Sequence, residues 1–338
     1  MVEYKRIAVD TSKSHFAIHA VDEGEQVVLR RDLGRGAFVA FIAKQAPSEF
    51  IFEACAGSHH WAREVLKRGH RVRLIPPQYV GAFRKRGKND RADAAALNDA
   101  ASRPDMASVP VKSVEQQADA VLLKVRMLLI RQRTQLANAV RGHAGEFGLV
   151  ASKGRCHVPE LLDQVAQSAL PETAKEGLAL LGERMAQPDA ALAAVDRRLV
   201  RLHRTNPTSR RLEGQPGVGP VTALTAALLV DPASFSSGRH FAAWLGLVPR
   251  QHSTAGRPQL GRISKQGNEV LRSLLVNGAM AVISHARRGS KSASPWLLKL
   301  LERKPRKVAA VALANKMARV LWAMMARGEG YRPMPALA

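Results

Sequence analysis

The sequence predicts an α/β domain at the N-terminus and a mostly helical remainder. Short apolar runs separated by polar turns fill the first 108 residues, which is typical of alternating strands and helices. Apolar residues at heptad spacing fill the middle, and apolar stretches separated by glycine and proline fill the end. We therefore expect three domains, at residues 1–108, 112–205 and 206–338.

The N-terminal domain is predicted to begin with three strands, at 4–10, 15–21 and 26–33. A polar turn joins the second strand to the third. The later elements alternate: a helix at 36–45, a strand at 49–53, a helix at 59–68, a strand at 70–75 and a helix from residue 89. Three antiparallel strands followed by this alternation is the element order of a ribonuclease H-like fold.

Four acidic residues lie at the ends of these elements. Asp10 and Glu53 each close an apolar run, so both carboxylates emerge where a strand ends. Asp90 and Asp93 lie three residues apart in an alanine-rich helix and project from the same face. Each acid alone is also compatible with an ordinary surface position. Converging carboxylates, however, repel one another unless cations lie between them, and their oxygens suit Mg²⁺ or Mn²⁺.

The charge of the chain predicts a polyanionic partner. The sequence has 52 Lys and Arg against 28 Asp and Glu, which gives a formal net charge of +24. From residue 205 onward there are 20 basic and 5 acidic residues, which accounts for +15 of that total. A field of this sign attracts nucleic acid.

Neither a membrane partner nor a disulfide framework is predicted. No apolar stretch approaches the roughly 18–20 residues of a membrane span, and the charged N-terminus lacks the apolar core of a signal peptide. Cys55 and Cys156 lie far apart without metal-ligand spacing, so no zinc site is indicated. We expect a cytoplasmic protein.

The middle of the chain is predicted to form long antiparallel helices. Apolar residues recur at heptad spacing from Ala118 to Ala139 and from Leu178 to Leu202. Pro188 lies inside the second stretch, and we expect the helix to break or restart there. Residues 152–159 are expected to form a loop between the helices. The two helices can pack as a hairpin within one chain or form a dimer interface, and the sequence leaves both open.

Two further groups of residues are candidates for phosphate contacts. Gly217 and Gly219 lie in a turn before an apolar helix, which resembles helix-hairpin-helix modules whose backbone N–H groups hold a phosphate. Lys13 and Lys88 flank the acidic residues, and each is a candidate for contact with a phosphate or with the acids themselves.

A polar loop in the C-terminal domain combines hydroxyl and basic side chains. Ser253 and Thr254 are the hydroxyl residues, and the basic residues around them are Arg250, Arg257, Arg262 and Lys265. One interpretation is a phosphate-binding loop with incidental hydroxyls. The other is a serine nucleophile whose phosphoryl target is held by guanidinium groups.

Motifs in both terminal domains occur in an order that a known family shares. The N-terminal motifs are Val9-Asp10 with Lys13, Phe52-Glu53-Ala54-Cys55-Ala56-Gly57, and Lys88-Asn89-Asp90-Arg91-Ala92-Asp93-Ala94. The C-terminal motifs are Gly217-Val218-Gly219-Pro220, Leu245-Gly246-Leu247-Val248-Pro249-Arg250, His252-Ser253-Thr254, and Gly261-Arg262-Ile263-Ser264-Lys265-Gln266-Gly267-Asn268. The chain thereby resembles the DEDD-type transposases, or recombinases, of bridge-RNA-guided insertion sequences, a family that includes a pilin-gene invertase.

The resemblance implies a RuvC-like N-terminal domain, a coiled-coil insertion and a C-terminal transposase domain. It implies that the four acids hold Mg²⁺ and that Ser253 attacks DNA to form a phosphoserine link, with Thr254 as the alternative nucleophile. Donor and target DNA, a structured bridge RNA, and other copies of the chain in dimers that pair into tetramers are the implied partners, in a protein associated with the bacterial nucleoid.

Two alternative functions would need only some of these residues. A metal-dependent nuclease such as a junction resolvase would use the four acids and water, without Ser253. A non-catalytic scaffold for nucleic acid would use the basic surface alone.

Overall fold

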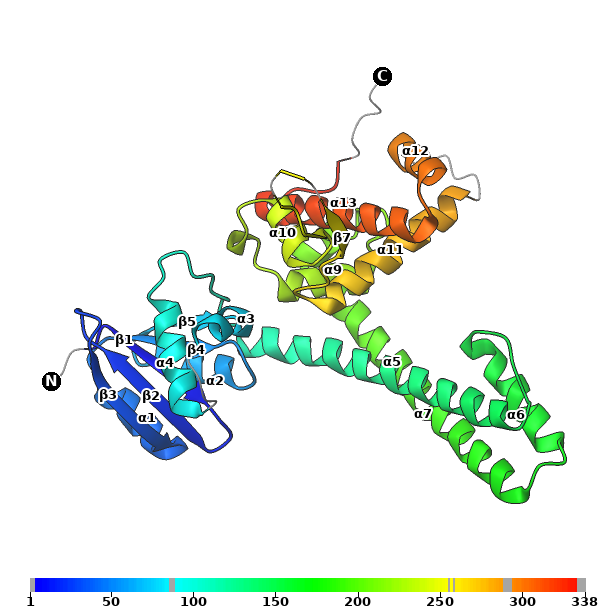
Figure 1. The fold of residues 1–338 in the computed structure, drawn as a ribbon, viewed down its shortest axis with the longest axis horizontal. Coiled ribbons are helices and arrows are strands. Elements are labelled where there is room, and N and C mark those ends of the chain that lie inside the picture. The colour runs from blue at the N-terminus through cyan, green and yellow to red at the C-terminus, as the bar shows by residue number, and fades with distance from the viewer. Residues whose placement is uncertain (1–3, 85–88, 255, 258, 288–293, 333–338) are drawn as a thin grey trace. The chain divides into compact units, whose positions relative to one another are not determined.

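The computed structural model describes residues 4–84, 89–254, 256–257, 259–287 and 294–332. The chain forms two compact units, Met1–Glu115 and Gln116–Ala338 (Figure 1). The finer division into three domains stays a prediction.

A five-stranded sheet forms the centre of the N-terminal unit, in the order β3-β2-β1-β4-β5. The strands are β1 (Arg6–Thr11), β2 (His15–Val21), β3 (Val27–Gly34), β4 (Glu49–Glu53) and β5 (Arg71–Ile75). β2 pairs antiparallel with both β1 and β3, whereas β4 pairs parallel with both β1 and β5. The predicted mixed α/β class with a mostly helical remainder is confirmed, and this strand order is consistent with a ribonuclease H-like domain.

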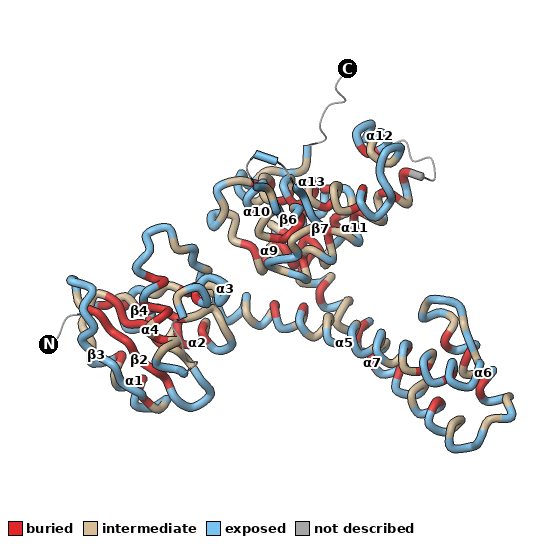
Figure 2. The backbone as a smooth tube through the Cα atoms, viewed as in Figure 1, coloured by how far each residue is buried: buried red, intermediate tan, exposed pale blue. Residues whose placement is uncertain are grey.

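Helices cover both faces of this sheet. They are α1 (Arg35–Lys44), α2 (Ser58–Leu66), α3 (Pro77–Val80), the 3₁₀ turn η1 (Gly81–Phe83) and α4 (Asp90–Ala101). Phe50 and Phe52 of β4 pack with α1 and α2, whereas Ile51 between them packs with α3 and α4. This alternation follows from the two-residue period of a strand and shows that β4 is buried on both faces. Figure 2 shows buried residues along β4.

The Gln116–Ala338 unit contains a pair of long helices, α5 (Val114–Glu146) and α7 (Glu172–Thr205). Arg126 of α5 contacts Asp196 of α7 at 2.6 Å, and Arg133 contacts Asp189 at 3.4 Å. The residue number of the α7 partner falls as that of the α5 residue rises, so the two helices run antiparallel. The hairpin within one chain is therefore present in the structure.

Three details of this region differ from expectation. α7 continues through Pro188, which is buried on the apolar side of the helix. The next residue, Asp189, forms ion pairs with Arg133 and Arg155. Residues 152–159 are not all loop, because η2 (Arg155–His157) leads into α6 (Val158–Gln167). On α5, Ala118 is exposed while Ala120 and Leu123 are buried. The predicted seam was wrong there because Leu123 of α5 packs against α9 as well as α7.

The rest of this unit is a helical core with one small hairpin. Its elements are α8 (Pro207–Leu212), α9 (Pro220–Leu229), η3 (Pro232–Ser234), α10 (Gly238–Trp244), β6 (Pro249–Gln251), β7 (Leu260–Ile263), α11 (Glu269–Arg287), α12 (Pro295–Arg303) and α13 (Arg306–Arg327). Phe241, Leu275 and Leu321 are fully buried in this core.

Within the described part of the chain, one helix, α13, is long and apolar enough to cross a bilayer by length and composition alone. This differs from the expectation that no apolar stretch has the length of a membrane span. Ala314, Met317 and Leu321 of α13 are buried in the C-terminal core, and core helices commonly have this composition.

Candidate functional site

Asp10 and Glu53 lie on neighbouring strands, on the same face of the sheet. β1 and β4 pair in parallel with Ala8 opposite Ile51, and the two acids lie two residues further along each strand. Side chains two residues apart on a strand share a face. Ala8 and Ile51 pack with α4, so the strand register alone directs both carboxylates to the α4 side.

The first turn of α4 supplies the other two acids. Asn89 caps this helix, its side-chain oxygen accepting a hydrogen bond from the Ala92 N–H at 2.8 Å. Asp90 and Asp93 follow within the first turn, where the helix dipole favours negative charge. Asp90 is exposed and Asp93 is partly buried.

The acids interact electrostatically. Burial raises the pKa of Asp10 to about 6, and the charges of Asp93, Asp90 and Glu53 add to this rise. Each of the other three acids therefore lies within electrostatic reach of Asp10. The structure brings the four predicted acids together as one negative cluster.

A cation lies within this cluster. The Arg84 side chain places Nε 2.9 Å from Asp93 Oδ1 and Nη2 3.7 Å from Glu53 Oε2. Among the described residues, no group of three His, Cys, Asp or Glu side chains is arranged to hold a single metal ion. The four acids lie near one another, and Arg84 is paired with two of them, Glu53 and Asp93.

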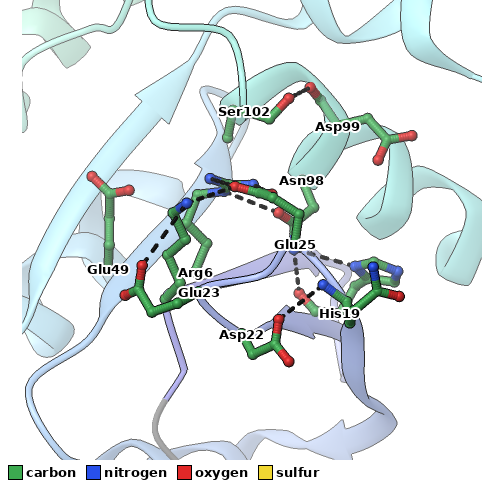
Figure 3. A network of polar contacts seen from close by, with 12 residues as sticks. Arg6, His19, Asp22, Glu23, Glu25, Glu49, Asn98, Asp99 and Ser102 are labelled. Carbon is green, nitrogen blue, oxygen red and sulfur yellow. Dashed lines mark hydrogen bonds and ion pairs between the residues drawn. The ribbon is translucent and has the colours of Figure 1, made fainter.

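A polar network fixes α4 to the sheet at the opposite end of β1 (Figure 3). Asn98 of α4 accepts a hydrogen bond from Arg6 Nε at 3.1 Å and donates one to the His19 carbonyl at 2.9 Å. Arg6 also pairs with Glu25, with Nη1 3.0 Å from Oε1, and Lys5 contacts the same carboxylate. Because Arg6 and Asn98 are buried, this network sets how α4 lies on β1 and thereby where its first turn meets Asp10.

Ser253 lies in the other unit, on the loop between β6 and β7. Its Oγ accepts a hydrogen bond from the Gln259 N–H at 3.1 Å, and the His252 N–H donates to the Gln259 carbonyl at 2.8 Å. Ser253 is half-buried, whereas Thr254 is exposed. Accepting this bond leaves the hydroxyl proton of Ser253 available to another group.

The base of this hairpin is tightly packed. A Cβ at Gly267 would lie 1.8 Å from the Trp244 carbonyl oxygen, and Gly267 has φ of +67°. Backbone hydrogen bonds join Ser264 to Val248 at 2.9 Å and Lys265 to Gly246 at 3.2 Å. The motif from 261 to 268 therefore holds the serine loop to the helical core.

The predicted phosphate-binding side chains of this loop are exposed. They are Arg250, Arg257, Arg262 and Lys265. Arg250 also donates to the Ser264 carbonyl at 3.3 Å. In the N-terminal unit Lys13 is exposed, while Lys88 lies outside the described residues.

The two predicted glycines of the hairpin before α9 differ in environment. Gly217 has φ of +84°, and a Cβ there would lie 2.9–3.0 Å from Met317, Val282 and the Gly278 carbonyl. This close packing requires glycine whether or not the turn binds phosphate. Gly219 faces open space at the start of α9. Of the two, Gly219 is the one accessible to a ligand.

A cavity of about 1780 Å³ lies beside the serine hairpin. Ile263 of β7 and Val311 and Met324 of α13 are among its apolar lining residues. Its basic lining residues are Arg239, Arg262, Lys265, Lys307, Lys316, Arg319, Arg327 and Arg332, with Glu329 as the acidic one. The sequence analysis singles out Arg262 and Lys265 as phosphate contacts; the other cations are spread over α10, α13 and the residues that follow.

Comparison with known proteins assigns both units to one family. Residues 209–294 match the family described as "Transposase IS116/IS110/IS902 family", and residues 7–147 match the DEDD-type domain of IS110 transposases, described as "Transposase".

Three relatives match along nearly the whole chain. A Sinorhizobium fredii protein named as a transposase, y4pF/y4sB, is 50% identical over 330 residues, 97% of this chain and 85% of the relative. A Pseudomonas aeruginosa protein named as a family 20 transposase is 45% identical, covering 97% of this chain and 98% of the relative. The transposase for insertion sequence element IS1111A of Coxiella burnetii is 38% identical, covering 98% and 92%.

These matches include the segments that carry the four acids and the serine loop, and every one of these relatives is named as a transposase. The chain belongs to the IS110 family of insertion-sequence transposases, enzymes that cut and rejoin DNA.

Proposed function

We propose that this transposase cuts and rejoins donor and target DNA through a phosphoserine intermediate on Ser253, assisted by Mg²⁺ at Asp10, Glu53, Asp90 and Asp93. The observation that carries the proposal is the convergence of the four acids: burial raises the pKa of Asp10 to about 6, and the charges of Asp93, Asp90 and Glu53 add to this rise. Four carboxylates held close together, with Arg84 paired to two of them, are suited to bind a cation from solution.

The donor set fits a hard divalent ion. All four ligands are carboxylates, which favours Mg²⁺, with Mn²⁺ as the alternative, over ions that prefer nitrogen or sulfur. When bound, such an ion would polarise a scissile phosphate and offset the charge that develops on it. Asp10 and Glu53 are supplied by rigid strands and Asp93 by a capped helix, so the ligands are held by regular structure.

The serine step can be written with its atoms balanced. Ser253 Oγ forms a bond to phosphorus, the bond from phosphorus to the 3′ oxygen breaks, and the hydroxyl proton is transferred to the departing 3′ oxygen. Attack by a second 3′ hydroxyl on the phosphoserine reseals the DNA and returns the proton to Ser253. The exposed guanidinium groups of Arg257 and Arg262 are suited to hold the phosphate during both steps.

The proposal includes further copies of the chain and a guide RNA. The acids belong to the N-terminal unit and Ser253 to the other, which allows a site assembled from two subunits in a dimer, with dimers pairing into tetramers. Base pairing by a bridge RNA would select the sites, while the basic surface holds backbones. The net charge of +24 and the 5% aromatic content suit backbone contact better than base stacking.

Ser253→Ala tests the mechanism in a cleavage assay. Full-length protein is incubated with DNA carrying the ends of its element, RNA transcribed from the element flanks, and Mg²⁺, and adducts are separated in denaturing gels. We expect wild type and Thr254→Ala to form a covalent protein–DNA adduct and Ser253→Ala to form none.

The rival functions give different patterns in the same assay. Cleavage that persists in Ser253→Ala and is lost in Asp10→Ala would indicate a resolvase-like nuclease that uses water. Adduct formation by Ser253→Ala but not by Thr254→Ala would move the nucleophile to Thr254.

A further inference from the structure

Arg84 contacts the acidic cluster from a different element than the acids themselves. It follows the 3₁₀ turn η1, and its guanidinium spans Glu53 at the end of β4 and Asp93 in the first turn of α4. The Nε–Oδ1 distance of 2.9 Å to Asp93 is that of a charge-assisted hydrogen bond, and the 3.7 Å to Glu53 is that of an ion pair.

The side chains that Arg84 joins are more buried than Arg84 itself. The exposed fractions are 20% for Glu53 and 15% for Asp93, against 40% for Arg84. The guanidinium can therefore swing into solvent at little cost in lost packing, whereas the carboxylates cannot leave. The long, half-exposed Arg84 side chain can therefore leave Glu53 and Asp93 while both acids stay in place.

Arg84 and a divalent ion would compete for the same oxygens. A carboxylate that accepts a hydrogen bond from a guanidinium has fewer lone pairs for a metal, and the fixed positive charge of Arg84 repels a second cation nearby. Among the described residues no three carboxylates are arranged around one point, and Arg84 occupies oxygens of two of the four acids.

We propose that Arg84 acts as the counter-ion of the metal-free cluster, joining Glu53 to Asp93, and leaves when a divalent ion binds. Arg84 is thus a positioning residue that keeps the acids close in the absence of metal and lowers the apparent metal affinity. This inference rests on the proposed metal centre.

The expected change follows from competition. If wild type must break the Arg84 contacts before binding metal, its apparent affinity is reduced by the fraction of molecules in which those contacts are open. For exposed or half-exposed ion pairs this penalty corresponds to roughly a fivefold change. Removing the guanidinium should therefore tighten metal binding while leaving the metal-free acids less well neutralised.

The test is a titration of the full-length, metal-free protein with Mn²⁺ and with Mg²⁺ by calorimetry, comparing wild type with Arg84→Ala. Arg91→Ala is the matched control, because Arg91 is also an arginine beside the cluster, next to Asp90, but pairs with Asp32 outside it at 2.6 Å. We expect Arg84→Ala to bind both ions roughly fivefold more tightly, and Arg91→Ala to change the affinity by less than about twofold.

Thermal unfolding provides a second readout. In the metal-free state Arg84→Ala should melt below wild type, and saturating Mn²⁺ should raise its melting temperature by more than it raises that of wild type. A purely structural role for Arg84 would lower both the metal-free and the metal-bound melting temperatures without tightening metal binding.

The outcomes separate the two proposals. Equal metal affinity in wild type and Arg84→Ala, weaker binding in Arg84→Ala, or equal tightening in Arg84→Ala and Arg91→Ala would each overturn the counter-ion role while leaving the metal centre intact. If wild type binds neither ion, or binds as well after Asp10→Asn and Asp93→Asn, the metal centre itself is wrong.

Discussion

At one end of the contact between β1 and α4, Arg6 is buried with Asn98 and Glu25 as partners, and at the other end Asp10 faces three more acids. The same two elements thus handle charge in opposite ways. Arg6 and Lys5 hold the pKa of Glu25 below its usual range, whereas burial and neighbouring acids raise that of Asp10. The first arrangement is complete within the protein and holds the helix in place, whereas the second is incomplete and calls for a ligand.

The largest expected effect, on DNA cleavage, comes from removing a charge in the acidic cluster around Asp10. Asp10→Asn should lower DNA cleavage by on the order of 10³-fold, because a ligand of the proposed metal centre is lost. The same change should raise the metal-free stability of the N-terminal unit by about 1 kcal/mol, since it removes the cost of burying a charged Asp10 and relieves the repulsion from the other acids. Asp105→Asn, an exposed acid after α4, is the control. A loss of stability in Asp10→Asn would contradict the comparison.

In the network of Arg6 and Asn98 at the other end of β1, removing a polar side chain should lower the stability of the N-terminal unit. Asn98→Leu leaves the buried Arg6 Nε and the His19 carbonyl without this partner, which should cost about 2–3 kcal/mol. Hydrogen exchange of β1 and β4 amides, read by mass spectrometry, measures the loss. Ser102→Ala at the exposed end of the same helix should cost under about 0.5 kcal/mol, and an equally small effect for Asn98→Leu would show that the network does not anchor α4.

The two ends should also respond oppositely to pH. Folded Asp10 keeps its proton up to about pH 6 while the unfolded chain loses it near 3.8, so this group reduces metal-free stability as the pH rises through that window. After allowance for screening by solvent, the fall is about 1 kcal/mol. The pKa of Glu25 is lowered in the folded protein. Its stabilising contribution is therefore present at pH values above the pKa of the unfolded chain and is lost as the pH falls.

Urea unfolding in EDTA between pH 3.5 and 7.5, at roughly unit pH intervals, tests this response. Asp10→Asn should remove the fall toward higher pH, and Glu25→Gln should remove part of the loss toward lower pH. Unchanged slopes in both variants would mean that neither carboxylate contributes as described.

The smallest effect is expected at the exposed surface of the first turn of α4. Arg91 pairs with Asp32 at 2.6 Å, and both side chains are exposed. Arg91→Ala should change the stability of the N-terminal unit by under about 0.5 kcal/mol. A larger loss, measured in the same exchange experiment, would show that α4 is held from its first turn as well as from Asn98.

The sequence was sufficient for the strand-borne part of the cluster and for the order of elements. Apolar runs ending in Asp10 and Glu53 predict strand ends, and the parallel register of β1 and β4 then brings the two acids to one face. The spacing of Asp90 and Asp93 in an alanine-rich stretch likewise predicts one helical face. These features are local, so residue order is enough to find them.

Other features depend on contacts between distant segments. The network of Arg6, His19 and Asn98 joins residues up to 92 positions apart, and no local pattern signals it. Pro188 is predicted to interrupt its helix, but α7 continues through it, and the next residue, Asp189, contacts Arg133 of the facing helix. Arg84 stands among other basic residues of the chain, and only the folded position distinguishes it from them.

The packing at the foot of the serine hairpin has a mechanical consequence. Because a Cβ at Gly267 would overlap the Trp244 carbonyl oxygen, any larger residue there must push the β6–β7 hairpin away from α10. Ser253 would be displaced with the hairpin, so a glycine remote from the hydroxyl helps to decide where the hydroxyl lies.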